Sequence, residues 1–437
     1  MPSVSCGRSA KASAQLAKKN MRTQIEIDKQ QPGAASGSDP KPAHWKSDIS
    51  VALLTGGSDR PYVFGLTKEL NSKGLTLDLV GSDELDCPDF RGVPHLNFLN
   101  LRGSQDPKAS ATKKVLRILS YYSKLIHYAA KARPRIFHIL WNNKFLHFDR
   151  TLLICYYRLL GKRIVLTVHN VNSARRDKND TALNRLTLRV QYRLAEHMFV
   201  HTEKMKKELM EEFGVPASRI SVIPLGINNS VPSTSLTSAE ARQRLGIQDG
   251  EKTILFFGRI TPYKGLEYLV EAFQKILPSA GKYRLMIAGR VDKEFAEYWA
   301  PIEAAIREDV RKGRMLLRAE HVPDEETEIY FKAADVLVLP YRDIYQSGIV
   351  FLGYSFGLPA LASDVGSLKD EVVEGNTGFI FKPEDPVDLA RIIEKYFASD
   401  LYKDLSGRRQ DIRDYATLKN NWDMVGKMTI GVYSSLL

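Results

Sequence analysis

The sequence of 437 residues is poor in cysteine, with only Cys6, Cys87 and Cys155. The three are odd in number, lie far apart and form no C-x-x-C pair, which argues against a disulfide framework and against a cysteine-based zinc site. No apolar run follows the basic residues near Met1, so we expect no signal peptide. These absences favour a reducing, cytoplasmic compartment.

Long hydrophobic runs are also missing. A membrane-spanning helix needs roughly 18 uncharged apolar residues, and the best candidate, Thr151 to Leu160, is short and contains Arg158. Hydrophobic residues make up 43% of the chain and charged residues 26%, which is typical of a globular protein. At roughly 100–200 residues per domain, the length predicts two or three domains.

Acidic residues are scarce in one part of the chain. Residues 101–200 hold 20 Lys and Arg against 5 Asp and Glu, whereas residues 201–437 hold 31 against 35. This asymmetry indicates a polyanionic partner for the first half, either nucleic acid, anionic lipid or a phosphorylated acceptor, or else a basic face in solvent. Since no helix-turn-helix, zinc or RNA-reading motif is present, we expect no nucleic acid partner.

The order of apolar and polar stretches predicts the fold class. Residues 1–46 are rich in Ser, Ala, Lys, Gln, Gly and Pro, a composition that predicts a disordered tail. From Asp48 onward, short apolar runs alternate with amphipathic stretches, as in doubly wound parallel sheets. We expect strands at residues 49–54, 75–80, 136–141, 164–168, 198–201, 220–224, 253–257, 284–288, 315–317, 336–340, 360–362 and 379–381, and helices that include 62–72, 266–276 and 388–397.

This α/β pattern occurs twice and predicts two Rossmann-like domains, residues 47–227 and 228–405. Residues 406–437 are predicted to form C-terminal helices that pack back on the first domain. Ligands of open α/β sheets bind outside the carboxyl ends of the strands, so we expect a site in the cleft between two facing domains.

Two cations follow a predicted strand of the second domain. Arg259 comes directly after Gly258, and Lys264 precedes Gly265 at the start of a helix. A guanidinium fork and an ammonium at the carboxyl edge of a sheet suit a diphosphate. From spacing alone, two solvated loop cations are an equal alternative.

A second candidate phosphate pocket lies at Ser347, Gly348 and Ile349, where a helix is expected to run from 348 to about 356. Small residues at a helix start leave backbone N–H groups free, with the positive end of the helix dipole behind them. The alternative is an ordinary serine cap on a buried helix. Two such sites in one domain favour phosphate binding.

These motifs resemble glycosyltransferase family four, also described as glycosyl transferases group 1. The resemblance extends from about Asp48 to the C-terminus and is densest over residues 253–382. It is carried by Gly258-Arg259-(x4)-Lys264-Gly265, Ala334-Asp335-Val336-Leu337-Val338-Leu339-Pro340, Gly357-Leu358-Pro359-Ala360-Leu361-Ala362-Ser363-Asp364-Val365-Gly366 and Glu374-Gly375-Asn376-Thr377-Gly378-Phe379.

The resemblance implies a role for individual residues. Arg259 and Lys264 match the family's cations on the donor diphosphate, and Gly56 and Gly57 match the glycine turn that approaches the donor. His169, after a predicted strand, matches the active-site histidine beside the transferred sugar. A structural histidine is the alternative for His169, although its strand edge should face the cleft.

The resemblance also implies the reaction. A GT-B enzyme of this family is a hexosyltransferase that holds a nucleotide-sugar, UDP- or GDP-linked, mainly in the second domain and retains the anomeric configuration. No metal is expected, because the cations neutralise the leaving diphosphate. Glu320 and Val322 lie in the turn that contacts the base in the family.

The sequence departs from the family at one motif. The family carries two glutamates separated by seven residues, and here the first falls on Ile344 or Tyr345 and the second on Leu352 or Gly353. None of these is acidic, although the second glutamate ordinarily grips the donor ribose. A catalytically weakened nucleotide-sugar-binding protein and an epimerase of the same fold are therefore alternatives to a transferase.

Residues 109–135 form a basic segment interleaved with apolar and aromatic residues, a pattern typical of helices that lie in a lipid interface. A helix that packs its apolar side on the first domain is the alternative. Arg175, Arg176 and Lys178 extend the basic excess. We expect a peripheral protein on the inner face of the cell membrane that glycosylates a lipid-linked glycan or a polysaccharide.

Overall fold

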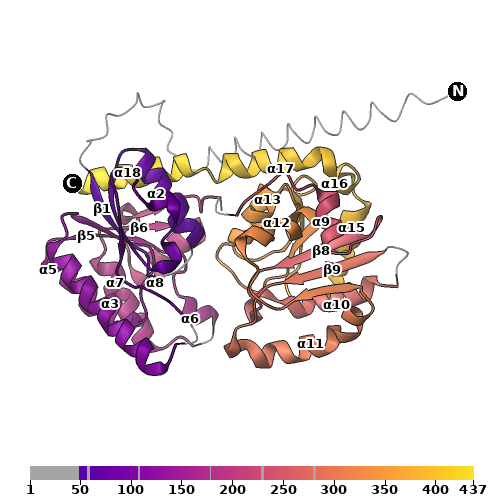
Figure 1. Ribbon diagram of the computed structural model, residues 1–437, viewed down its shortest axis with the longest axis horizontal. Helices are drawn as coiled ribbons and strands as arrows, with labels where there is room; N and C mark the ends of the chain where they lie inside the picture. The colour runs from indigo at the N-terminus through magenta and orange to yellow at the C-terminus, as the bar shows by residue number, and fades with distance from the viewer. Residues whose placement is uncertain (1–48, 57–59, 107–108, 178, 228–230, 279–281) are drawn as a thin grey trace. The chain divides into compact units, whose positions relative to one another are not determined.

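The computed structural model describes residues 49–56, 60–106, 109–177, 179–227, 231–278 and 282–437 (Figure 1). The predicted tail, residues 1–46, and the predicted donor-binding Gly57 lie outside the described residues. The chain divides into two compact units. The N-terminal unit runs to Gly226 and includes Asn421–Leu437, and the C-terminal unit is Ile227–Asn420.

The N-terminal unit contains a parallel sheet of seven strands. The central strands are short runs of buried apolar residues, as expected where helices cover both faces of a parallel sheet. In spatial order the strands are β3 (Leu96–Asn100), β2 (Thr76–Gly81), β1 (Ser50–Leu54), β4 (Ile136–Ile139), β5 (Arg163–Thr167), β6 (His197–Val200) and β7 (Ile220–Val222).

The helices of the N-terminal unit pack their apolar faces on this sheet and on one another. The main ones are α2 (Arg60–Ser72), α3 (Ala111–Lys131), α4 (Leu146–Phe148), the π-helical turn η3 (Asp149–Leu153), α5 (Ile154–Leu159), α6 (Ser173–Arg176), α7 (Ala182–Leu194) and α8 (Glu203–Phe213).

The last helix, α18 (Trp422–Leu436), belongs to the N-terminal unit and lies beside α2 (Figure 1). Trp422 is pressed against two glycines, since a Cβ on Gly65 or Gly226 would lie 2.1 or 2.5 Å from its ring. The Tyr433 hydroxyl lies 2.6 Å from Nδ1 of the buried His138. Helix α18 therefore forms part of the core of this unit.

The C-terminal unit contains a parallel sheet of six strands. In spatial order they are β10 (Met315–Arg318), β9 (Tyr283–Ala288), β8 (Lys252–Phe257), β11 (Val336–Leu339), β12 (Ala360–Ser363) and β13 (Gly378–Phe381). Its helices are α9 (Ser238–Arg244), α10 (Leu266–Ile276), α11 (Ala296–Arg311), α12 (Asp324–Ala333), α13 (Gly348–Ser355), α14 (Leu368–Glu371), α15 (Pro386–Ala398), α16 (Asp400–Lys403) and α17 (Leu405–Lys419). Helix α17 packs on α13, so the segment 406–437 is divided between the two units.

Two parallel α/β sheets confirm the predicted fold class, and each expected strand is present within one or two residues at its ends. Strand β3 was not expected. It is an edge strand whose sequence, Leu-Asn-Phe-Leu-Asn, alternates partly buried and exposed side chains and so lacks the continuous apolar run of the central strands. No helix of the described residues is long and apolar enough to cross a membrane.

Candidate functional site

The strand order of the C-terminal unit places several polar loops at one edge. Strands β9, β8 and β11 are neighbours and parallel, so the loops that follow them leave the sheet side by side. The loops are 258–265 after β8, 289–292 after β9 and 340–347 after β11. Two of them are in backbone contact, because a Cβ on Gly289 would lie 2.0 Å from the carbonyl oxygen of Gly258.

Lys264 lies at the end of a 3₁₀ turn, Pro262–Lys264, and only 7% of it is exposed. A Cβ on Gly258 would lie 2.8 Å from its Nζ and 3.6 Å from Cδ1 of Ile349, so the ammonium group lies beside the first turn of α13. Among the described residues, no carboxylate forms an ion pair with it. Burial, and then the charge of Arg259, lower the pKa of Lys264 to about 7. A buried cation without a counter-ion is unfavourable unless a ligand supplies the negative charge.

Arg259 is half exposed, and its Nε lies 3.2 Å from a carboxylate oxygen of Asp292. The other oxygen of Asp292 lies 2.7 Å from Nε of Arg290. Arg290 and Asp292 were not predicted from the sequence, although a signal is present. Gly289-Arg290 follows β9 as Gly258-Arg259 follows β8. The carboxylate of Asp292 thus holds two guanidiniums at the same sheet edge.

Helix α13 begins without a side-chain cap, since the buried Ser347 donates instead toward the Tyr341 hydroxyl at 3.5 Å. The alternative of an ordinary serine cap is therefore wrong. The amides of Gly348 and Ile349, at the first positions of the helix, have no side-chain acceptor among the described residues. Next to them, Oε1 of Gln346 is buried without a hydrogen-bond partner in the described chain. Both features are suited to a polar ligand at this helix start.

The turn after β10 holds the two residues predicted to contact a base. Val322 is buried, whereas the side chain of Glu320 is 71% exposed and accepts a hydrogen bond from Nε of Arg318 at 3.1 Å. The turn is joined to the β9 loop, because the amide of Gly289 donates to the carbonyl of Arg318. It therefore lies next to the cationic loops along the same edge.

In the N-terminal unit, the predicted Gly56 and His169 are brought together by Trp141. Gly56 follows β1 with φ of 59°, and a Cβ there would lie 2.4 Å from the carbonyl oxygen of Trp141. The His169 ring, after β5, stacks on the Trp141 indole with centroids 4.1 Å apart. Only glycine fits the turn at Gly56, because the backbone of Trp141 and Asn142, which follow β4, approaches it so closely.

The hydrogen bonds of His169 determine its tautomer. Nδ1 of His201 must carry a proton, because its partner at 3.2 Å is the carbonyl of Ile223. Since burial lowers the pKa of His201 to about 4, its Nε2 is an acceptor, and His169 Nδ1–H donates to it at 3.1 Å. Burial, and then His201 and His138, also lower the pKa of His169. His169 is thus neutral, and its buried Nε2 is an acceptor with no partner among the described residues.

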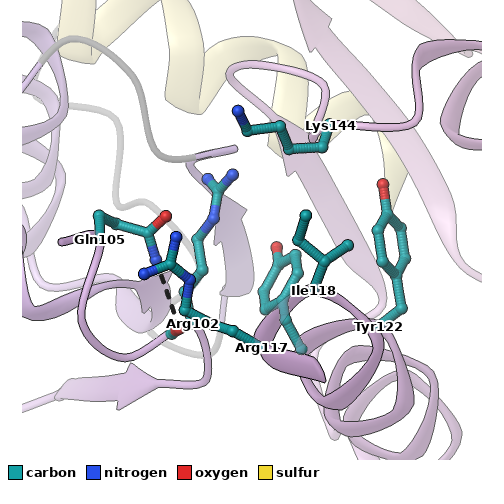
Figure 2. A pocket seen from close by; sticks show the side chains of 7 residues that line it. Arg102, Gln105, Arg117, Ile118, Tyr122 and Lys144 are labelled. Carbon is teal, nitrogen blue, oxygen red and sulfur yellow. Dashed lines mark hydrogen bonds between the residues drawn. The ribbon is translucent and has the colours of Figure 1, made fainter. Parts of the chain in front are cut away.

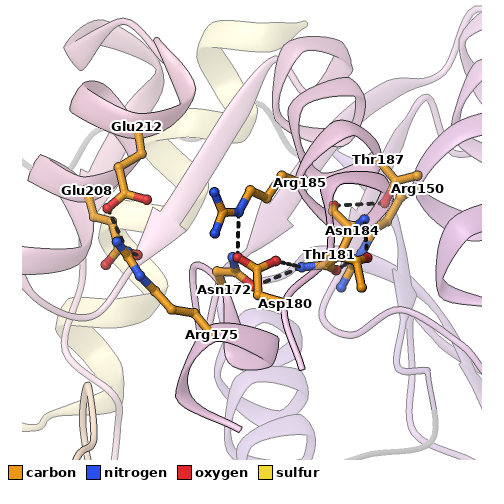
Figure 3. Close-up of polar contacts among 10 residues, drawn as sticks. All are labelled: Arg150, Asn172, Arg175, Asp180, Thr181, Asn184, Arg185, Thr187, Glu208 and Glu212. Carbon is orange, nitrogen blue, oxygen red and sulfur yellow. Dashed lines mark hydrogen bonds and ion pairs between the residues drawn. The ribbon is translucent and has the colours of Figure 1, made fainter. Parts of the chain in front are cut away.

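The loop that continues from His169 is anchored on α7 by the contacts in Figure 3. Nδ2 of Asn184 donates to Asn172 at 3.0 Å and to Asp180 at 2.8 Å, and Nη1 of the buried Arg150 donates to Oδ1 of Asn184. This network holds Asn172 and Asp180 against α7. The loop that follows His169 is therefore fixed in position by hydrogen bonds to α7.

The sequence predicted that Arg175 and Arg176 would extend the basic excess of the N-terminal unit. In the structure, both side chains are instead paired with acidic residues. Arg175 forms ion pairs with Glu208 and Glu212 of α8 (Figure 3), and Arg176 forms one with Asp177. Lys178 lies outside the described residues.

Comparison with known sequences decides the family. Residues 237–418 match the family described as Glycosyl transferases group 1, and residues 56–231 match Glycosyltransferase Family 4. The two matches cover both units. The chain belongs to the family 4, group 1 glycosyltransferases.

Individual relatives are distant. A protein of Methanocaldococcus jannaschii, described as an uncharacterized glycosyltransferase, is 30% identical over 240 residues, which are 53% of this chain and 58% of that protein. The chain spans about half the length of the curated relatives that it matches.

Solved structures show the fold of this chain. Sucrose-phosphate synthase from Thermosynechococcus elongatus aligns with a TM-score of 0.70 at 19% identity, over 89% of this chain and 99% of that one. The Anabaena protein HepE, solved in complex with UDP-glucose, aligns with a TM-score of 0.65 at 14% identity, over 89% of this chain and 100% of that one. The predicted GT-B fold is confirmed.

The departure of this chain from the family's glutamate pair has a structural counterpart. Leu352 and Gly353 of α13 are both buried, and a Cβ on Gly353 would lie 2.8 Å from the side chain of Leu337 in β11. Ile344 is buried as well. A side chain at Gly353 would therefore require the Leu337 side chain to shift, and a carboxylate there would be buried among apolar residues.

Proposed function

We propose that this glycosyltransferase moves a sugar from a UDP- or GDP-linked donor to an acceptor hydroxyl with retention of anomeric configuration. The observation that carries the proposal is the buried ammonium group of Lys264, which has no carboxylate partner among the described residues and lies beside the uncapped start of α13. Arg259 and Arg290 stand at the same sheet edge, held by a single carboxylate. A diphosphate offers the negative charge that this arrangement lacks.

In this proposal the protein stabilises the leaving group. The bond between the anomeric carbon and the diphosphate oxygen breaks, and the acceptor oxygen bonds to that carbon on the same face. The acceptor proton passes to the departing phosphate. Lys264, Arg259 and the α13 amides stabilise the negative charge that develops on the diphosphate. Stabilisation of transition-state charge by preorganised cations and N–H groups is usually the largest single contribution to catalysis. No metal is required.

His169 has a separate role in the proposal. Its unpartnered, unprotonated Nε2 accepts a hydrogen bond from a hydroxyl of the transferred sugar. Because the ring is neutral and His201 holds its other nitrogen, His169 orients the sugar and does not act as a general acid. The UDP-glucose complex of the HepE neighbour supports a nucleotide-sugar as the ligand class.

The acceptor is proposed to lie at a membrane surface, as a lipid-linked glycan or a growing polysaccharide on the cytoplasmic face. Helix α3 leaves large apolar side chains exposed although it is packed on the unit, and neighbouring elements add more of them. The exposed set is Val115, Leu116, Leu119, Ile126, Phe145, Leu146, Leu152, Leu159, Leu160, Leu183 and Leu186. Tyr122 of α3 stacks on Phe145, and Tyr156 of α5 bonds the carbonyl of Ile126, so α3, α4 and α5 adjoin. Such apolar side chains beside lysines and arginines fit an anionic lipid interface.

A catalytically weakened nucleotide-sugar-binding protein is the second candidate, and the apolar residues in place of the family glutamates favour it. A same-fold epimerase would convert the donor without any acceptor. The test is to screen UDP- and GDP-sugars by thermal shift and then follow donor hydrolysis and sugar transfer with the ligand that binds. Hydrolysis or transfer with retained configuration supports a transferase, whereas tight binding without turnover supports the second candidate.

The site assignment is tested by Lys264→Ala and Arg259→Ala. Each is expected to lower kcat/KM by about 10²–10³-fold, as for the loss of one group that stabilises transition-state charge. Lys275→Ala is the matched control, because this exposed lysine of α10 pairs with Glu271 away from the loops. Wild-type turnover in both single variants and in their combination would remove the basis of the proposal.

A further inference from the structure

The N-terminal unit carries a second cationic site, outside the residues matched to the donor. A groove of about 410 Å³ opens between residues 101–106, which follow β3, and the first half of α3. Arg102, Ser104, Lys113, Arg117, Ser120 and Lys124 line it. A smaller recess adjoins the groove, shares Arg102 and Arg117 with it, and adds Gln105, Tyr121 and Lys144 to the lining.

The lining of this groove and recess is positively charged. Among the described residues, none of its five cations forms an ion pair, and Asp106 is the one acidic residue among the lining side chains of the described chain. In Figure 2 the guanidinium of Arg102 is directed toward the ammonium group of Lys144, and the guanidinium of Arg117 lies beside Gln105 on the other side of Arg102. Like charges repel unless an anion lies between them, so the groove, together with the adjoining recess of about 20 Å³, is suited to an anionic ligand.

Both arginines are held in place by backbone carbonyls. Nη1 of Arg117 donates to the carbonyl of Ser104 at 2.6 Å. Arg102 donates to the carbonyl of Gly56, and its guanidinium lies 5.2 Å from the ring centre of Tyr121. A guanidinium has five N–H donors, so each arginine keeps others for a ligand. Gln105, which bonds the carbonyl of Arg102, helps to fix the loop (Figure 2).

Lys144 is positioned by the bonds of its neighbours. Asn143 accepts from the Tyr121 hydroxyl at 2.6 Å and donates to the buried Asp149 at 3.3 Å. On the other side, the amide of Phe145 donates to the Tyr122 hydroxyl at 3.0 Å. Because the residues on both sides of Lys144 are tied to α3 and η3, these two elements fix the position of Lys144 in the recess.

The recess is connected to the glycine turn. Arg102 bonds the carbonyl of Gly56, and Gly56 touches the backbone of Trp141, on which His169 stacks. An anion in the recess would therefore be connected through Arg102, Gly56 and Trp141 to His169, which the proposed function places at the transferred sugar. This connection indicates that the anion belongs to the second substrate.

The groove and the exposed apolar residues lie on different sides of α3. Lys113, Arg117 and Lys124 follow one stripe of the helix at spacings of four and seven residues, whereas Leu116 and Leu119 follow another. The groove is therefore a site of its own, separate from the apolar edge.

We propose that this groove and recess bind a phosphate group on the acceptor, with Arg102, Arg117 and Lys144 as its ligands. A phosphate has three oxygens that match two guanidinium forks and an ammonium. This inference rests on the proposed transfer reaction. The phosphate belongs either to a soluble phosphate ester or to a lipid headgroup.

The test measures phosphate binding directly and does not depend on turnover. Inorganic phosphate, glucose 6-phosphate and glucose are titrated by calorimetry at constant ionic strength against the full-length protein and against Arg117→Gln and Lys144→Gln. Lys131→Gln is the matched control, since Lys131 lies in the last turn of α3 and lines neither cavity. A parallel arm measures sedimentation with vesicles of phosphatidylcholine, with and without phosphatidic acid.

We expect Arg117→Gln and Lys144→Gln each to weaken binding of the phosphate probe at least about tenfold, whereas Lys131→Gln does not. An effect on inorganic phosphate and glucose 6-phosphate assigns the site to a soluble ester, and an effect confined to phosphatidic acid vesicles assigns it to a headgroup. The inference is overturned if no probe binds more weakly to the two variants than to the control. Donor binding, measured on the same variants, stays unchanged and separates this failure from a failure of the proposed function.

Discussion

Lys264 illustrates how a single side chain acquires a function from its surroundings. Its ammonium group is enclosed by Gly258, Tyr341 and Ile349, and no acid of the described chain neutralises it. The same burial that lowers its pKa to about 7 strengthens its interaction with any anion that enters. His169 is a comparable case, because the bond to His201 decides which ring nitrogen faces a ligand.

The pH dependence of donor binding follows from the lowered pKa of Lys264. A bound diphosphate favours the charged form and raises this pKa, so binding above pH 7 takes up a proton. Affinity for UDP or GDP is therefore expected to fall as pH rises above about 7, by up to about tenfold per pH unit. Calorimetry in buffers of different ionisation heat measures both the affinity and the proton uptake.

The control for that experiment is Lys264→Arg, because arginine stays charged throughout the range. Its affinity is expected to vary little between pH 7 and 9. In the donor-free protein, the free energy of unfolding changes with pH in the opposite direction to the donor affinity. The pKa of Lys264 in the folded protein lies below its ordinary value of 10.5, so the free energy of unfolding contributed by Lys264 rises as pH increases from about 7 toward 10.5. A wild-type affinity that is flat with pH would contradict the assignment of Lys264.

His201→Phe tests the tautomer of His169. The change removes the acceptor at Nδ1 of His169, so the ring can place its proton on Nε2, where it no longer accepts a bond from a sugar hydroxyl. Loss of one hydrogen bond worth about 1 kcal/mol predicts a roughly fivefold lower kcat/KM with the full donor. A donor sugar without the hydroxyl that contacts His169 is expected to show no such loss, and an equal loss for every donor would indicate a purely structural role.

At the scale of elements, the loops at the sheet edges depend on glycines that allow the backbones to meet. Gly265 has φ of 62°, and a Cβ there would lie 2.1 Å from the carbonyl oxygen of Pro340, at the end of β11. The β8 loop and the β11 loop are thereby locked together, and Lys264 is held at their junction. The geometry of the cationic edge is thus a consequence of strand packing.

A comparison of Gly265→Ala with Gly313→Ala separates the effect of the close contact with Pro340 from the effect of positive φ alone. Both glycines have positive φ, but nothing lies within 4 Å of a Cβ on Gly313. Urea unfolding is expected to show a loss of about 1 kcal/mol for Gly313→Ala, from the left-handed conformation alone. Gly265→Ala is expected to lose more than about 2 kcal/mol and to weaken donor binding. Equal losses in the two variants would show that the contact with Pro340 is easily relieved.

The elements differ in how well the sequence predicted them. Strands such as β8 are continuous apolar runs, so their existence and order were predictable from local pattern. The edge strand β3 was not, because half-buried edge residues alternate with polar ones. Arg290 was missed for a related reason, since its significance depends on β9 lying next to β8.

At the scale of the whole chain, basic charge and exposed apolar side chains are concentrated in the N-terminal unit. Residues 101–200 hold 20 basic and 5 acidic residues, and the same stretch contains eleven of the exposed large hydrophobic side chains, including Leu116 at 64% and Leu119 at 56% exposure. The positive charge alone would be suited to many kinds of anionic partner. The combination with apolar side chains on adjoining helices favours a lipid surface.

Leu116→Ser with Leu119→Ser tests the membrane surface. Because a buried leucine contributes roughly 1.5–3 kcal/mol, the double variant is expected to bind vesicles of phosphatidylcholine and phosphatidylglycerol at least about tenfold more weakly. High salt should weaken wild-type binding as well. Val387→Ser with Leu418→Ser, in the C-terminal unit, is the control with similar exposure. Sedimentation that is the same for both double variants would contradict this surface.

The sequence by itself determined the two cycles of strands and helices, the family, and the loops that carry Arg259, Lys264 and His169, because these are encoded by local runs of residues and by short motifs. Only the tertiary structure decided which groups share a site. Four features join residues that are separate in the chain: the pairing of Arg259 and Arg290 through Asp292, the lowered pKa of Lys264, the tautomer of His169, and the recess that Arg102, Arg117 and Lys144 line together. Strand order and burial bring them together, and neither is visible in a local pattern.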